Sequence, residues 1–334
     1  MAHPAVTAAR TTGGGAGPAR LADALAVGPV VLDGGLATRL EARGNDLSSP
    51  LWSARMLLDD PAEVVAAHRD YFAAGAQVAT TASYQASFDG LAAAGLDRLQ
   101  TRELLLRSVR LATHARDETV GDGRPRWIAA SIGPYGAARA DGSEYRGDCG
   151  LTVDELRRWH RPRLAVLAES GADVLALETI PCAAEAEALM AEVSGLGIPA
   201  WLSVTGVLDR SAAGGSRVLT RAGEDAAELF AMAADVEEIV AVGVNCCDPD
   251  ELAAVAVAAS HKVVVAYPNS GEGWDVTGRR WTGPATFGAE SAAAYVDRWL
   301  AAGVRLIGGC CRVGPDTIAA VAAAVTDTVA AADD

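Results

Sequence analysis

Four of the six cysteines form two adjacent pairs, and each pair ends an apolar stretch of the chain. Cys246-Cys247 closes one such run, and Cys310-Cys311 follows a second run and two glycines. Thiols that come together from two distant parts of a chain suit a soft divalent metal such as zinc better than magnesium or calcium. The residue types and their positions therefore indicate a metal centre with sulfur ligands.

The set expected to converge is Cys246, Cys310 and Cys311, which leaves one position of a tetrahedral zinc open. Structural zinc sites normally have four protein ligands, whereas catalytic sites keep one position free. The chain also lacks the CxxC spacing of structural sites. A substrate thiol in the open position would lose its proton and could attack a methyl group on a good leaving group. The alternative is that strand-end cysteines are small buried hydrophobic residues.

Eight short apolar segments alternate with helical segments and would place these residues. The expected strands are Pro29–Gly34, Ala76–Tyr84, Arg126–Gly133, Ala172–Thr179, Ala200–Thr205, Glu238–Cys246, Lys262–Tyr267 and Val304–Cys310. Their near-continuous apolar character is typical of parallel strands buried on both faces. Eight such units predict a single-domain α/β fold, the (β/α)8 TIM barrel, with its site at the carboxyl ends of the strands. A doubly wound open sheet is the alternative, but no GxGxxG sequence opens a helix.

The helical segments carry start and stop signals. Thr152 and Glu155 predict a capping box, and Gly75, Gly171 and Gly303 each end a helix and lead into a strand. The expected helices are Pro61–Ala74, Leu96–Thr119, Leu156–Ser170, Cys182–Ser194, Glu224–Ala234, Pro249–Ser260, Ala289–Ala302 and Pro315–Ala331.

The bulk composition narrows the class of protein. A formal charge of −15 argues against nucleic acid or an anionic membrane as a partner and favours a small-molecule role. No stretch approaches the roughly 20 apolar residues of a membrane span. Residues 1–20 are expected to form a disordered tail without a signal-peptide core, and residues 21–332 the barrel. This predicts a cytoplasmic protein in which Cys149 and Cys182 remain free thiols.

Nine short motifs run through the expected barrel. They are DGGLAT (33–38), PLWSA (50–54), TASYQA (81–86), SIGPYGA (131–137), DGSEYRG (141–147), LETIP (177–181), GVNC (243–246), YPNSGE (267–272) and GGCCR (308–312). By these motifs the chain resembles the homocysteine S-methyltransferases from about Leu32 to Ala320. GVNC followed by GGCC is the most specific element. DGSEYRG and YPNSGE favour the branch that uses S-methylmethionine over users of betaine or folate.

The resemblance implies roles for individual residues. Cys246, Cys310 and Cys311 match the zinc ligands of the family, so the implied cofactor is Zn2+, while Cys247 has no such role and is expected to pack. Asp33 and Glu178 match positions that hold the amino group of homocysteine in relatives. Carboxylates at a barrel mouth can bind an ammonium group through charge-assisted hydrogen bonds. Each alone fits a helix N-cap or a solvated strand end equally well.

Further substrate contacts are expected around the same mouth. Backbone amides from Ser131 to Gly133 could take the substrate carboxylate, and Asn245 is expected to orient the site or to serve a turn. Tyr84 and Tyr267 could enclose a sulfonium by cation–π contact, with plain packing as the alternative.

The reaction that follows is a direct displacement. The zinc-bound thiolate of homocysteine would take a methyl group from S-methylmethionine, or from S-adenosylmethionine, and methionine would form. Segment 208–217 departs from the family pattern, which bears on donor preference. The alternatives are a zinc-binding or redox-sensing barrel without methyl transfer and an aldolase-like barrel. The aldolase chemistry needs a strand-borne lysine, but Lys262 is the only lysine and begins a strand.

Overall fold

Eight parallel strands form the central ring of the protein, as expected from the sequence. The computed structural model describes residues 20–47, 53–119, 121, 123–139, 142–211, 216–252, 255, 259, 261–275 and 280–333. Most of the expected tail, residues 50–52 of PLWSA and Asp141 lie outside these ranges. The strands follow the order β1-β12-β9-β8-β5-β4-β3-β2. They are β1 (Val30–Val31), β2 (Val78–Thr80), β3 (Trp127–Ile132), β4 (Val174–Ile180), β5 (Ala200–Val204), β8 (Ile239–Asn245), β9 (Val263–Tyr267) and β12 (Val304–Ile307).

The first and second strands bring the ring to near closure. Leu32, just beyond β1, forms a parallel bridge with Val78 of β2. The backbone N–H of Gln77 donates to Val31 O at 2.7 Å, and that of Asp33 donates to Val78 O at 2.9 Å. Each strand overlaps one of the eight expected segments, so the barrel is confirmed and the open sheet is not.

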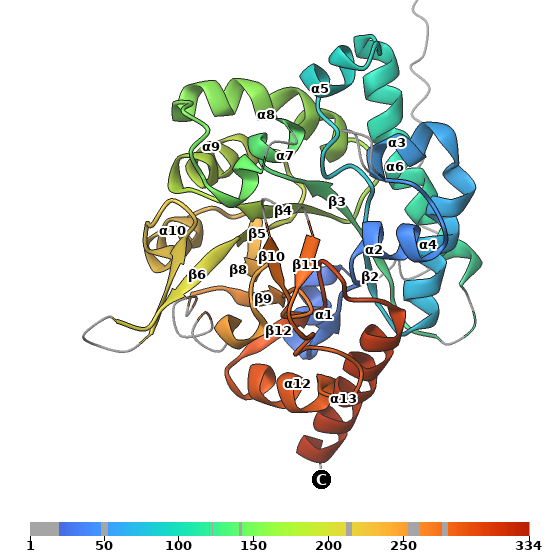
Figure 1. Cartoon of the computed structure of the whole chain (residues 1–334), viewed down its shortest axis with the longest axis vertical. Helices are drawn as coiled ribbons and strands as arrows, with labels where there is room; N and C mark the ends of the chain where they lie inside the picture. Colours follow the sequence, from blue (N-terminus) through green and yellow to red (C-terminus); the bar gives the residue numbers. More distant parts are fainter. Residues whose placement is uncertain are drawn as a thin grey trace, which may run out of the picture.

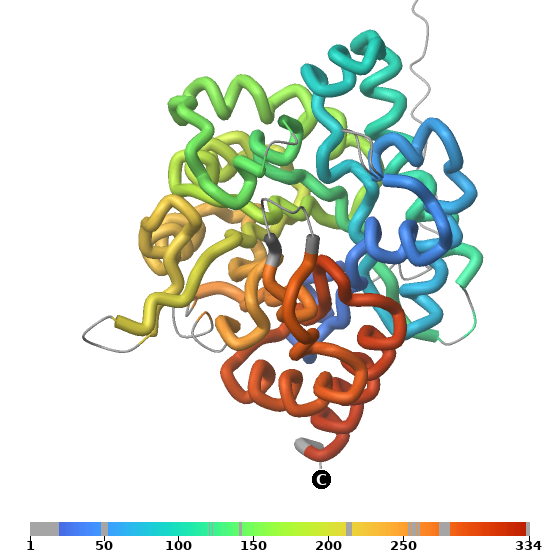
Figure 2. The backbone as a smooth tube through the Cα atoms, in the orientation of Figure 1, coloured from blue at the N-terminus to red at the C-terminus, as the bar shows by residue number. Residues whose placement is uncertain are grey.

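Helices surround the ring in chain order (Figures 1 and 2). The main ones are α4 (Pro61–Ala73), α6 (Arg98–Glu118), α8 (Val153–Ala168), α9 (Ala183–Val193), α10 (Ala226–Ala234), α12 (Ala292–Ala301) and α13 (Pro315–Asp333). The expected capping box is present, since Glu155 N–H donates to Thr152 Oγ1 at 3.3 Å and Thr152 N–H donates to Glu155 Oε2 at 2.9 Å. Of the expected Pro249–Ser260 helix, the first turn is the 3₁₀ helix η2 (Pro249–Glu251), and several later residues lie outside the described ranges. No helix within the described residues is both long and apolar enough to cross a membrane.

Smaller elements that the sequence did not reveal mostly follow the strand ends. They are α2 (Leu36–Ala42), α3 (Ser53–Asp59), α5 (Phe88–Ala93), α7 (Tyr135–Arg139), η1 (Ser143–Tyr145) and the hairpins β6 (Gly206–Asp209)–β7 (Arg217–Thr220) and β10 (Gly273–Asp275)–β11 (Arg280–Thr282). They are too short to show a hydrophobic period of their own. They build the βα loops of the barrel, which is the side where such folds carry their sites.

A short helix before the first strand helps fill the barrel interior. Helix α1 (Leu21–Val27) buries Leu21 and Leu25 in one cluster with inward-facing strand residues such as Trp127 and Trp201. A second, larger cluster lies between the strands and the outer helices. Because α1 runs directly into β1, it covers the amino-terminal end of the barrel and leaves the carboxyl end for the site.

Truncation of Leu25 to alanine should destabilise the barrel by about 2–4 kcal/mol, because it leaves a cavity in the inner cluster. Leu25 is 5% exposed, whereas Val27 of the same helix is 91% exposed, so Val27→Ala is a matched control. The control should change stability by less than about 0.5 kcal/mol. Denaturant midpoints of the two variants and the parent protein measure the difference. Equal midpoints would show that α1 does not contribute to the core.

Candidate metal centre and substrate site

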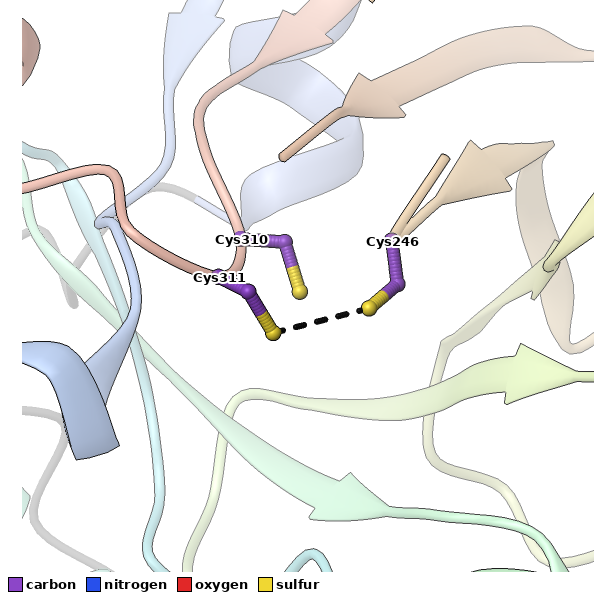
Figure 3. Close-up of side chains that lie close together, drawn as sticks. All are labelled: Cys246, Cys310 and Cys311. Atoms are coloured by element: carbon purple, nitrogen blue, oxygen red, sulfur yellow. Dashed lines mark hydrogen bonds between the residues drawn. The ribbon is translucent and has the colours of Figure 1, made fainter. Parts of the chain in front are cut away.

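Three cysteine sulfurs converge at the carboxyl ends of two strands (Figure 3). Cys246 directly follows β8, Cys310 and Cys311 follow β12, and β9 lies between these strands. The sulfurs of Cys246 and Cys311 are 3.6 Å apart, and all three lie within 4.8 Å of one another. Three sulfurs on a tetrahedral zinc, at about 2.3 Å each, would be about 3.8 Å apart. The spacing therefore suits a metal ion held by three sulfurs.

The end of β9 holds both ligand segments through the backbone. Cys246 N–H donates to Tyr267 O at 3.2 Å, and Cys310 N–H donates to Pro268 O at 2.7 Å. Cys311 N–H donates to the side-chain Oδ1 of Asn269 at 3.1 Å. The Tyr-Pro-Asn sequence thus fixes all three cysteines relative to one another. Cys247 packs instead in the outer hydrophobic cluster, as expected.

Close packing and one unusual turn shape the backbone around the three cysteines. Gly308 permits the close packing, since a Cβ there would lie 2.5 Å from Leu32 Cβ and 2.7 Å from Asp33 O. The left-handed backbone occurs at Cys246 itself, with φ +53°. Such a φ is uncommon for a residue with a side chain and is found where the surroundings impose it.

The three thiols strongly affect one another's ionisation. Hydrogen bonds from Cys310 and Cys311 hold the pKa of Cys246 well below its ordinary value. The same contacts with the Cys246 sulfur raise the pKa of Cys310 and of Cys311 well above theirs. One thiolate therefore forms readily, and its negative charge disfavours deprotonation of the other two thiols. A divalent cation would remove this opposition, because a coordinated thiol is deprotonated.

Asp33 lies buried at the end of β1 and is neither a helix N-cap nor solvated. It is 2% exposed, and its carboxyl oxygens accept hydrogen bonds from Thr80 N–H and Thr80 Oγ1, each at 2.7 Å. Burial raises its pKa to about 8 in spite of these bonds, and the nearby carboxyl of Glu178 adds to the rise. A buried acid of this kind ionises readily only when a cation comes close.

Glu178 lies on β4 and is likewise buried, with 7% exposure. Ser131 Oγ is hydrogen-bonded to Glu178 Oε1, and Tyr267 Oη lies 3.0 Å from Glu178 Oε2. Burial raises the pKa of this carboxyl to about 7. The two carboxyls are electrostatically coupled, so the barrel mouth offers two acids that a single cation could ionise together.

Asn245 holds an unusual turn at the end of β4. Thr179 N–H donates to Asn245 Oδ1, and Asn245 Nδ2–H donates to Thr179 Oγ1, each at 2.7 Å. Thr179 has φ +62°, which is costly for a β-branched residue and needs such support. Asn245 Nδ2 also lies 4.0 Å from Cys310 Sγ. Its contacts link the turn after Glu178 with the ligand loop.

The aromatic and backbone groups expected to contact substrate have partners already. Tyr267 is buried, and its hydroxyl contacts Trp201 and Ser203 as well as Glu178. The N–H of Ser131 donates to Thr81 Oγ1 at 3.1 Å, and that of Gly133 donates to Tyr84 O at 3.1 Å. A substrate carboxylate at these two amides would have to replace those bonds.

Several residues of this region were not singled out from the sequence. Tyr145, in η1, places its hydroxyl 3.3 Å from Cys246 Sγ. Thr80 and Ser203 bind groups of the expected site, and Trp201 donates to Tyr267. Ser203 could have been identified from the sequence, because it is a polar residue inside an otherwise apolar strand. The roles of Tyr145, Thr80 and Trp201 could not, since their partners lie on neighbouring strands or loops.

Known proteins are similar to this chain in sequence and in fold. Residues 30–325 match the sequence family described as homocysteine S-methyltransferase. Homocysteine S-methyltransferase YbgG of Bacillus subtilis (strain 168) is 43% identical over 304 residues, covering 88% of this chain and 93% of the relative. Homocysteine S-methyltransferase 2 of Arabidopsis thaliana is 40% identical over 314 residues, covering 88% and 92%.

A solved structure shows the same architecture. The metallated form of the homocysteine methyltransferase MmuM from Escherichia coli aligns with a TM-score of 0.74 and 38% identity, covering 88% of this chain and 96% of that one. Together with the converging cysteines, the match over nearly the whole barrel shows that the chain belongs to the homocysteine S-methyltransferase family of enzymes.

Proposed function

We propose that the protein transfers a methyl group from a sulfonium donor to the thiol of L-homocysteine, giving methionine, with zinc held by Cys246, Cys310 and Cys311. The observation that carries the proposal is the convergence of three sulfurs at zinc-like spacing beside two buried carboxyls. Three ligands leave one position for a substrate thiol, which suits catalysis rather than a structural role.

Bound there, zinc would supply a lowered thiol pKa, so that homocysteine sulfur reacts as a thiolate. The protein groups do the positioning. Asp33 and Glu178 would hold the ammonium group, since both acids ionise more easily beside a positive charge. The sulfur would then face the donor methyl in line with its leaving sulfur, which departs with the bonding electrons.

S-methylmethionine is the donor we propose, with S-adenosylmethionine as the competing sulfonium. The base of the β6–β7 hairpin lies beside a ligand, because Thr205 Oγ1–H donates to Cys246 O at 3.2 Å and Arg221 Nε lies 3.4 Å from Thr205 Oγ1. Segment 208–217 belongs to this hairpin, apart from residues 212–215, which are not described. Its departure from the family pattern is therefore a place where donor preference could change.

The zinc-loaded protein should form methionine from homocysteine and S-methylmethionine. Two methionines should appear for each donor consumed, because both substrates become methionine. A panel with S-methylmethionine, S-adenosylmethionine and betaine, followed by quantification of methionine, ranks the donors. Protein that binds zinc but makes no methionine with any of them would leave a zinc-binding or redox-sensing barrel as the better explanation.

Cys310→Ala should abolish stoichiometric zinc binding and methyl transfer, because two thiolates remain in a site built for three. We expect zinc affinity to fall by more than about 100-fold, beyond the usual effect of a lost outer-shell contact. Cys247→Ala is the matched control, since it removes a neighbouring thiol that packs away from the site. Metal analysis after dialysis against a competing chelator measures both variants. Full zinc content in Cys310→Ala would refute the ligand assignment.

Glu178→Gln should reduce kcat/KM for homocysteine by about 10- to 100-fold, since a charge-assisted hydrogen bond contributes about 1.5–3 kcal/mol. The glutamine preserves the size of the side chain and its contacts with Ser131 and Tyr267. 4-Mercaptobutanoate, which lacks the amino group, serves as the control substrate and should lose little. An equal loss with both thiols would mean that Glu178 does not bind the ammonium group.

A further inference from the structure

A continuous row of buried polar side chains crosses the barrel interior from Glu178 toward the metal ligands. Glu178 Oε2 lies 3.0 Å from Tyr267 Oη, Tyr267 Oη lies 2.7 Å from Ser203 Oγ, and Ser203 Oγ lies 2.7 Å from Asn245 Oδ1. All four side chains are buried. We call these four residues the polar chain. Each of its three contacts needs one proton between its two heavy atoms.

The amide of Asn245 fixes the direction at one end of the polar chain. Its Oδ1 faces the N–H of Thr179 at 2.7 Å, and its Nδ2 faces Thr179 Oγ1. A backbone N–H can only donate, so the atom beside it must be the amide oxygen. That oxygen can only accept, and the proton between Asn245 and Ser203 must therefore come from the Ser203 hydroxyl.

The positions of the other two protons follow from the one already assigned. Ser203 donates its only hydroxyl proton to Asn245, so the contact between Ser203 and Tyr267 requires the tyrosine proton. Trp201 Nε1–H donates to Tyr267 Oη at 3.0 Å and occupies an acceptor position of that oxygen. Tyr267 then has no proton left for Glu178, although the two oxygens are at hydrogen-bond distance. The third proton must reside on Glu178 Oε2.

We propose that Ser203 and Tyr267 hold Glu178 as a neutral acid in the resting enzyme, so that the ammonium group of homocysteine binds in exchange for one proton. The inference rests on the proposed role of Glu178 as an ammonium contact. On binding, the O–H bond of the carboxyl breaks, the proton leaves to solvent, and an ammonium N–H replaces it at the carboxylate. Ser203 is thus a positioning residue that acts through Tyr267.

The charged groups around Glu178 agree with a neutral resting state. Asp33, from β1, is the other buried acid and adds no positive charge. Cys246, from the end of β8, raises the pKa of Glu178 further when it is a thiolate, after the larger effect of burial. Three thiolates around one divalent ion carry a net charge of −1, so a bound metal would not reverse this effect. In the part of the chain that the structure describes, the hydrogen-bond partners of Glu178 are the neutral hydroxyls of Ser131 and Tyr267.

The protonation of Glu178 can be read directly in the metal-loaded protein without substrate. Infrared difference spectra between the parent protein and Glu178→Gln should contain the carbonyl band of a protonated carboxylic acid at pH 6. The band should disappear as the pH rises above about 7, because that pKa of Glu178 includes a hydrogen bond from Tyr267 to the carboxylate, which the polar chain withholds. Glutamine donates an N–H to Tyr267 where the acid donates its O–H, so the variant preserves the polar chain. At pH 6 Asp33 is protonated in both proteins, because burial raises its pKa to about 8, and its band cancels there.

The role of Ser203 is tested by the pH dependence of KM for homocysteine. In the parent protein KM should fall as the pH rises above about 7, because Glu178 must lose its proton without a hydrogen bond from Tyr267. Ser203→Ala frees Tyr267 to donate to the carboxylate, which should move this dependence downward by about one pH unit, the equivalent of one net hydrogen bond. Ser108→Ala removes another buried hydroxyl, bonded to Leu105 O in α6, and should leave the profile in place.

Tyr267→Phe provides a second variant, for which the inference and its alternative predict opposite shifts. Loss of the oxygen that accepts the Glu178 proton should move the KM profile downward, whereas loss of a hydrogen bond donated to the carboxylate would move it upward. A carboxylate at Glu178 at pH 6, an upward move in Tyr267→Phe, or unchanged profiles in both variants would overturn the inference. Because the infrared measurement needs no substrate, its result does not depend on whether the protein transfers methyl groups.

Discussion

The anchoring of two cysteine segments on the end of β9 is the constraint on which the candidate site depends. Strands β8 and β12 both pair with β9, in a register that matches Asn245 with Tyr267 and Ile307 with Ala266. The segments that follow β8 and β12 therefore leave their strands at nearly the same level of the barrel. The backbone oxygens of Tyr267 and Pro268 then accept from Cys246 and Cys310. A one-residue slip in a parallel strand would turn the side chains to the opposite face, and the sulfurs would not meet.

Burial is the second physical condition, and it acts on every polar group of the mouth at once. In a low-dielectric interior an unpaired polar group is costly, so the hydroxyls and amides there are held in defined hydrogen bonds. The same burial disfavours charge on Asp33 and Glu178. The site is therefore both rigid and reluctant to ionise without a ligand. A strained turn at Thr179 persists because Asn245 supports it from both sides.

Much of this arrangement was predictable from sequence, because the signals were local and repeated. Apolar runs predicted all eight strands, and the adjacent cysteines at two strand ends predicted the three sulfurs that converge. Tyr267 shows the limit of that reasoning. One expectation was that this tyrosine, at a strand end, would face a donor sulfonium. Its hydroxyl instead forms hydrogen bonds with Trp201 and Ser203. Those partners lie on β5, and side-chain direction across a barrel cannot be read from spacing along one strand.

The two conditions together explain how the mouth can favour homocysteine over a simple thiol. Three cysteines select sulfur but not the rest of the molecule, since any accessible thiol could fill an open position. Two acids that resist ionisation in the free enzyme interact weakly with water and strongly with a cation that replaces their protons. On the proposed function, the ammonium group and the thiol of one substrate would reinforce each other, because binding at either end brings the other within reach at high effective concentration. Selectivity would then arise from the fixed separation between the sulfur cluster and the buried carboxyls, which the barrel strands set.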